Sequence, residues 1–196
     1  MIVHTGVFRV GLFVLLFFQA GAVAAQENRA AKALASQPFT IADGAFELEA
    51  PGDWKAVKPK IRLIEREFSI PAADGDEAPG RLTVMAAGGG VEANIARWVG
   101  QFRSPEGGAI AGDAKKVEKK EIAGMEVWLV ELRGDYQDKP SPFARQAVNR
   151  PNYRMLAAIV PTEGRGTWFF KLYGPAATIE AAEKSFRSMI EGVRKP

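Results

Sequence analysis

The chain of 196 residues contains no cysteine and only one histidine, His4. The lack of cysteine excludes disulfides, thiolate nucleophiles and thiolate metal sites. An excess of one charge is also lacking, because 26 Lys and Arg residues are offset by 23 Asp and Glu residues, for a formal net charge of +3. Nearly balanced charge gives little electrostatic steering toward nucleic acid, so we expect no nucleic-acid partner.

Long apolar runs are lacking except at the N-terminus. Residues 1–25 place Arg9 ahead of an apolar stretch over 10–18, and small residues follow over 20–25. This order is typical of a secretory signal peptide, and we expect cleavage before Gln26. The apolar stretch is shorter than the roughly 20 residues that span a bilayer, which favours cleavage over an uncleaved anchor. The sequence therefore predicts export to the periplasm or the extracellular space, and a mature form that does not span a membrane.

Cleavage of this segment would also remove the single histidine, His4. The mature chain would then have no Ser-His or Cys-His pair and none of the usual zinc, haem or copper ligand sets. It would also lack the side chain that most often transfers protons near neutral pH. We therefore predict no metal and no cofactor, and any catalysis would have to use carboxylates, lysine, tyrosine or oxygen-bound cations.

The remaining chain is predicted to contain a flexible, alanine-rich tether over residues 26–37 and one domain over 38–196. Period-two and fully apolar runs predict strands, and two amphipathic patterns predict helices. The order is strands, a helix, more strands and a final helix, which indicates an α+β fold with an antiparallel β-sheet flanked by helices. The predicted strands cover 39–41, 45–50, 61–70, 81–87, 115–123, 125–133, 154–160 and 167–173, and the predicted helices cover 91–103 and the segment that starts at Pro175. The high charge of the strand over 115–123 predicts that it lies at a sheet edge. The buried face of the last helix is predicted to comprise Ile179, Ala182, Phe186, Met189, Ile190 and Val193.

Two aromatic groups are predicted to lie in the core. Trp98 and Phe102 share one face of the first helix with Ile95, so we expect both rings to be buried. The run 168–170 (WFF) and Tyr173 are interpreted as part of a central strand covered by helices, and an exposed recognition patch is the alternative interpretation.

Several acidic motifs are too incomplete to indicate a site. Asp74, Asp76 and Glu77 lack the rest of an EF-hand loop, so a solvated loop is favoured over a calcium site. Glu65 and Glu67 would share one strand face, which could form a carboxylate pair for glycosidic chemistry. A solvent-facing strand edge is the simpler interpretation of that pair.

The longest predicted loop covers residues 134–153 and combines prolines with basic and aromatic residues. Long loops in compact domains often carry function. This composition predicts a binding site for an anionic or glycan partner, and a solvated loop stiffened by its prolines is the alternative. The candidate binding residues, at and beside this loop, are Tyr136, Lys139, Phe143, Arg145, Arg150 and Arg154.

The order of these features resembles the PsbP-like family, which includes extrinsic proteins of the photosynthetic oxygen-evolving complex and many exported bacterial proteins. The matching segments are 46–54 (FELEAPGDW), the helix face over 95–102, 124–128 (GMEVW) and 168–175 ahead of the last helix. The resemblance covers about residues 39–194. It implies an α/β/α sandwich and provides no family-wide catalytic residue.

We therefore predict an exported, non-catalytic binding or accessory domain of the bacterial cell envelope. Its partner would be an envelope protein or an anionic or glycan ligand. The alternative is a carboxylate- or Lys-based hydrolase that acts on envelope polymers. A carboxylate enzyme of that kind requires two acids that converge in a cleft.

Overall fold

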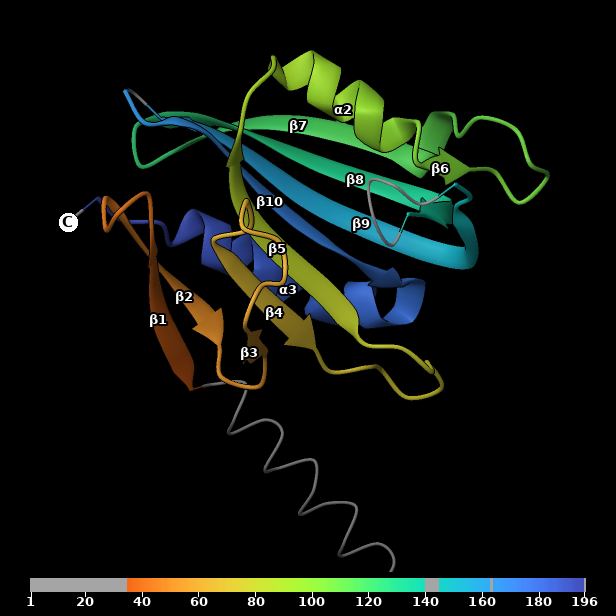
Figure 1. Cartoon of the computed structure of the whole chain (residues 1–196), viewed down its shortest axis with the longest axis horizontal. Coiled ribbons are helices and arrows are strands. Elements are labelled where there is room, and N and C mark those ends of the chain that lie inside the picture. Colours follow the sequence, from red (N-terminus) through yellow and green to blue (C-terminus); the bar gives the residue numbers. More distant parts are fainter. Residues whose placement is uncertain (1–34, 140–144, 163, 196) are drawn as a thin grey trace, which may run out of the picture.

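The computed structural model describes residues 35–139, 145–162 and 164–195 (Figure 1). The predicted signal peptide and the tether up to residue 34 lie outside these residues. The first strand begins at Ser36, two residues before the predicted domain boundary. The elements are β1 (Ser36–Ile41), β2 (Phe46–Pro51), β3 (Lys55–Val57), β4 (Arg66–Ile70), β5 (Gly80–Ala87), α2 (Val91–Val99), β6 (Phe102–Arg103), a 3-10 turn (Gly112–Ala114), β7 (Lys115–Ile122), β8 (Met125–Asp138), β9 (Val148–Thr162), β10 (Gly166–Pro175) and α3 (Ala176–Glu191).

One antiparallel sheet dominates the described chain. Its order is β3-β4-β5-β10-β9-β8-β6, and β7 also pairs with β8. The strand predicted to lie at an edge, β7, pairs only with β8, so that prediction is confirmed. β10 lies between β5 and β9, and its Trp168, Phe169 and Phe170 are at most 5% exposed. The interpretation of this run as a buried central strand is therefore confirmed.

The sheet separates two cores. Figure 1 shows α2 on one face and α3 on the other, and the β1–β2 hairpin lies on the α3 side. The α3 core joins Leu48 of the hairpin to Phe170 and Phe186, and the α2 core joins Trp98 and Phe102 to β8, β9 and β10. This arrangement confirms the predicted α/β/α sandwich. The buried face predicted for the last helix is also confirmed, and it comprises Ile179, Ala182, Phe186, Met189, Ile190 and the following Val193.

The first helix is shorter than predicted, because α2 ends at Val99 rather than at residue 103. Gly100 closes the helix, and Phe102 then enters a short strand opposite Tyr136 of β8. Trp98 is 4% exposed and Phe102 is fully buried, so both rings anchor the α2 core as predicted.

The predicted loop over residues 134–153 is wrong for most of its length. β8 continues to Asp138 and β9 begins at Val148, so the two strands form a long hairpin. The prolines were interpreted as loop residues, but Pro151 lies within the hairpin, where the register between β8 and β9 shifts. A bulge leaves its extra residue outside the hydrogen-bond ladder, and a proline without an N–H group is tolerated there.

Smaller differences concern element ends. The predicted strand over 61–70 is a strand only from Arg66 to Ile70. The last helix starts at Ala176, so Pro175 precedes it instead of occupying its first turn. The hydroxyl and backbone N–H of Thr178 donate to a carboxylate oxygen of Asp76 at 2.6 and 2.9 Å. Asp76 therefore caps the start of α3 from a distant loop.

Candidate functional site

The α2 face of the sheet carries polar residues where α2 does not cover it. Along β10, Phe169 packs under Trp98 of α2 with 5.9 Å between ring centroids. Lys171 and Tyr173 follow on the same face, because side chains two residues apart point the same way. They stand opposite Thr83 and Arg81 of β5. The uncovered end of this face is therefore polar and aromatic.

A cavity of about 450 Å³ lies at this end of the sheet, and no residue of α2 lines it. We call it the Arg81 cavity. Strands β3, β4, β5, β8, β9 and β10 all contribute to its wall, so it draws together parts of the chain that are far apart in sequence. Its lining includes Glu67, Arg81, Asp138, Arg150, Tyr153 and Tyr173.

Two ion pairs stand in the wall of the Arg81 cavity. Arg81 Nε donates to Glu67 Oε1 at 2.8 Å, and Arg81 Nη1 donates to the hydroxyl of Tyr173, also at 2.8 Å. Burial alone would lower the pKa of Arg81, but Glu67 and Tyr173 hold that pKa above its usual value. The second pair joins Arg150 Nε to Asp138 Oδ2 at 3.4 Å. Each arginine of the cavity therefore already has a carboxylate partner.

A half-buried lysine lies beside the cavity among tyrosine rings. Lys171 Nζ donates to Gln101 Oε1 at 2.8 Å and to the hydroxyl of Tyr136 at 3.2 Å. It also lies 5.0 and 4.8 Å from the ring centroids of Tyr136 and Tyr173. Burial, and then the positive charges of Arg97 and Arg81, lower the pKa of Lys171 to about 7. Burial raises the pKa of both tyrosines, so their hydroxyls stay protonated at neutral pH.

The lowered pKa of Lys171 has a consequence for stability. Folding lowers this pKa from 10.5 to about 7, so the folded state binds fewer protons than the unfolded state between these values. The contribution of Lys171 to the free energy of unfolding therefore rises with pH across this window. We expect the free energy of unfolding of Lys171→Met minus that of wild type, measured with denaturant, to fall from about pH 7 toward about pH 9.5. A difference that does not change with pH would show that the amine is well solvated.

The structure separates the six predicted binding residues. Tyr136 is 5% exposed and stands opposite Arg150 in the register of β8 and β9. Lys139 and Arg145 are exposed and lie beyond the paired strands, and Phe143 lies outside the described residues. Arg154 is buried on the opposite face, where it pairs with glutamates under α3. Two of the six therefore meet at the α2 face, and their role in binding stays a prediction.

Sequence reasoning missed most of the cavity. Arg81, Asp138 and Lys171 were not among the predicted residues. Tyr173 was interpreted as part of the buried central strand, with an exposed recognition patch as the alternative. One signal was present, because Lys171 stands within a strand of aromatic and aliphatic residues where a charge needs a special environment. The pairing of Glu67 with Arg81 depends on the register of β4 and β5, which the sequence does not show.

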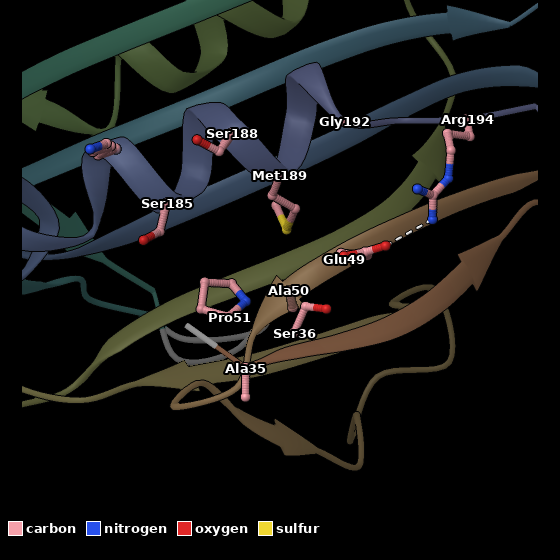
Figure 2. Close-up of a pocket in the computed structure, with 11 residues that line it drawn as sticks. Ala35, Ser36, Glu49, Ala50, Pro51, Ser185, Ser188, Met189, Gly192 and Arg194 are labelled. Carbon is pink, nitrogen blue, oxygen red and sulfur yellow. Dashed lines mark hydrogen bonds and ion pairs between the residues drawn. The ribbon is translucent and has the colours of Figure 1, made fainter. Parts of the chain in front are cut away.

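Figure 2 shows a second cavity, of about 350 Å³, between α3 and the β1–β2 hairpin. Small side chains such as Ser185, Ser188 and Ala50 form much of its wall. At one end Arg194 Nη2 donates to Glu49 Oε1 at 2.9 Å, and this hydrogen bond is the main cause of the lowered pKa of Glu49. The cavity offers no aromatic ring, so it provides less to recognise a ligand than the Arg81 cavity does.

Further features bear on the class of protein. Within the described residues, no group of three or more His, Cys, Asp or Glu side chains is placed to hold a metal ion. No helix in that part of the chain is long and apolar enough to cross a membrane.

Comparison with known proteins identifies the fold of the chain, through its similarity to solved structures. No protein-family model matches the chain, and no curated protein sequence matches it either. Among solved structures, it is similar to the cyanobacterial PsbP of Synechocystis, with a TM-score of 0.52 and 11% identity over 82% of this chain and 92% of that one. It also matches a Pseudomonas aeruginosa protein of unknown function described as a putative regulator (TM-score 0.43, 12% identity, 80% of this chain and 94% of that one). A third match is LpqN of Mycobacterium tuberculosis, described as involved in cell envelope biogenesis (TM-score 0.46, 12% identity, 87% of this chain and 96% of that one). The likeness to the Synechocystis protein shows that the chain has the PsbP fold, as the sequence resemblance implied.

Proposed function

We propose that this chain is an exported, non-catalytic accessory domain of the bacterial cell envelope that binds a glycan in the Arg81 cavity. The observation that carries the proposal is the wall of that cavity, where two ion-paired arginines stand beside Tyr153 and Tyr173. A volume of about 450 Å³ lies within the range of small-ligand sites.

The pairing of the arginines favours a glycan over a simple anion. A carboxylate or phosphate ligand would have to compete with Glu67 for Arg81 and with Asp138 for Arg150. Sugar hydroxyls both donate and accept hydrogen bonds, so they can bind to an arginine and its carboxylate together. The apolar faces of a sugar ring can lie against the tyrosine rings. A glycan therefore uses the cavity without breaking its ion pairs.

Export and a role in the envelope rest on the sequence. The basic, apolar and small-residue order of residues 1–25 supports secretion, and the PsbP resemblance supports an accessory role.

A non-catalytic role is supported by the contacts of Glu67 and Asp138. Both carboxylates line the cavity, but each is held in an ion pair with an arginine. Neither is placed as an unpaired acid that could face a glycosidic bond, as glycoside hydrolysis needs.

Binding can be tested with two arginine variants. We expect Arg150→Ala to weaken binding of a bacterial cell-wall glycan, selected on a glycan array, by roughly tenfold or more, because a charged hydrogen-bond partner is lost from the cavity. Arg145→Ala is the matched control, because Arg145 is exposed and does not line the cavity. Isothermal titration of both variants measures the effect. Equal affinities for wild type and Arg150→Ala would contradict glycan binding at this site.

A Lys-based hydrolase is the second candidate, and Lys171 is the observation that favours it. A general base works best when its pKa lies near the working pH, and the pKa of Lys171 is about 7. This alternative predicts release of soluble fragments from isolated envelope polymers, with a midpoint in the pH–rate profile near that value and no release by Lys171→Met. The binding proposal predicts no release by either protein.

A further inference from the structure

The loop between β3 and β4 exposes apolar and basic side chains together. Residues 58–63 read KPKIRL, so cations and aliphatic residues alternate toward its end. Ile61 is 44% exposed and Leu63 is 70% exposed. Within the described residues, no other large hydrophobic side chain is as exposed as Leu63. A single exposed leucine is ordinary, but an exposed leucine in a turn beside an exposed isoleucine and three exposed cations is not.

The structure holds these side chains outward. Ile64 is 8% exposed and anchors the end of the loop in the protein. Its backbone N–H donates to the carbonyl of Ile61 at 3.1 Å, which places Arg62 and Leu63 at the centre of a turn. The next N–H, of Glu65, donates to Val84 of β5 at 2.8 Å and ties the turn to the sheet. Leu63 is therefore presented to the surroundings by a fixed backbone.

The charge of the loop is of one sign. Lys58, Lys60 and Arg62 are exposed, and none of them forms an ion pair with another described residue. The adjoining acid, Glu65, lies 4.0 Å from the guanidinium of Arg66 and also accepts the backbone N–H of Ala42 at 3.4 Å. The cations of the loop are therefore available to an external anionic surface.

We propose that this loop docks the protein on an anionic phospholipid bilayer, with Ile61 and Leu63 entering the interface and the three cations contacting lipid phosphates. Such a surface is negative outside and apolar just beneath, which matches the alternation of cations and aliphatic side chains along the loop. This docking does not depend on glycan binding in the Arg81 cavity.

The absence of cysteine makes a local test possible. In the full chain, Leu63→Cys is labelled with the environment-sensitive fluorophore NBD, and Val117→Cys serves as the matched control. Val117 is 44% exposed, but it lies on the charged edge strand β7. We expect vesicles that contain phosphatidylglycerol to shift the emission at position 63 to the blue. The emission at position 117 should not change, and vesicles of pure phosphatidylcholine should give a much weaker response at position 63.

Charge reversal completes the test. With Lys58→Glu and Lys60→Glu added to the labelled protein, the lipid concentration for half-maximal response should rise at least about tenfold, because one basic residue near an anionic surface contributes roughly fivefold. All the substituted side chains are exposed, so the melting temperature of each variant should stay close to that of wild type. No response at position 63, an equal response at both labels, or a response unaffected by charge reversal would overturn the proposal. An acidic protein partner in place of a bilayer would leave the label unresponsive to vesicles.

Discussion

Replacing Trp98 with alanine is expected to lower the free energy of unfolding by about 3–5 kcal/mol. Trp98 is 4% exposed and packs edge-on against Phe169 of the central strand. Truncating a buried tryptophan removes its apolar contacts and leaves a cavity that the neighbouring strands cannot fill. Denaturant unfolding at neutral pH measures the effect.

The control for this variant is Glu92→Ala, on the exposed side of the same helix. We expect it to change the free energy of unfolding by less than about 1 kcal/mol. If Trp98→Ala were as mild as the control, the α2 face would not form a core. Gln101 follows the Gly100 cap of α2 and accepts a hydrogen bond from Lys171. Without a packed α2, that hydrogen bond would also lose its fixed position.

Replacing Arg154 with alanine is expected to lower the free energy of unfolding by about 3–5 kcal/mol, because it removes the buried cation shared by two carboxylates. Among the described residues, Glu131 and Glu183 would then keep only the more exposed Arg133 and Arg187 as partners. Arg154 is 3% exposed, and its Nη2 atom lies 2.8 Å from Glu131 and 2.5 Å from Glu183 of α3. Burial alone would raise the pKa of Glu131, but hydrogen bonds and charges from Arg133 and Arg154 hold it below its usual value. The arrangement ties α3 to the sheet.

The pH dependence of this effect has a defined sign. Because the pKa values of Glu131 and Glu183 are lowered in the folded state, the stability that they contribute is present above the ordinary carboxyl pKa and is lost as the pH falls through the folded values. The gap between wild type and Arg154→Ala should therefore narrow in acid.

A control variant separates this structural role from binding. Arg133 also pairs with Glu131, and the side chain of Arg133 is 52% exposed. Arg133→Ala should therefore lower the free energy of unfolding by less than about 1 kcal/mol. If Arg154→Ala left stability unchanged and abolished ligand capture, Arg154 would belong to a binding surface as its sequence context predicted. The structure places it under α3 instead.

Most of the fold could be predicted from strong periodic patterns in the sequence. The face of α3 and the apolar middle of β10 were predictable because helical and strand periods assign side chains to a buried or exposed side without knowledge of their neighbours. The hairpin of β8 and β9 was not predictable in the same way. Pro151 is a strong loop signal in sequence, and only the register shift shows that it occupies a bulge.

The candidate site was predictable only in part, for a related reason. Tyr136 and Arg150 were found because both lie on the same stretch of chain. Arg81 and Asp138 come from strands on opposite sides of β10, so strand order and register must be known before they can be placed around one cavity. Arg154 was misplaced because one step along a strand reverses the face that a side chain occupies.

If this domain binds its ligand in the Arg81 cavity, the residues that line the cavity should respond to that ligand. The most direct measurement is a map of backbone amide shifts in ¹⁵N-labelled protein, titrated with the cell-wall glycan that binds it on the array. We expect perturbations that cluster at Arg81, Asp138, Arg150, Tyr153 and Tyr173. Perturbations confined to the cavity between α3 and the β1–β2 hairpin, or no saturable perturbation with any array-positive glycan, would contradict binding in the Arg81 cavity.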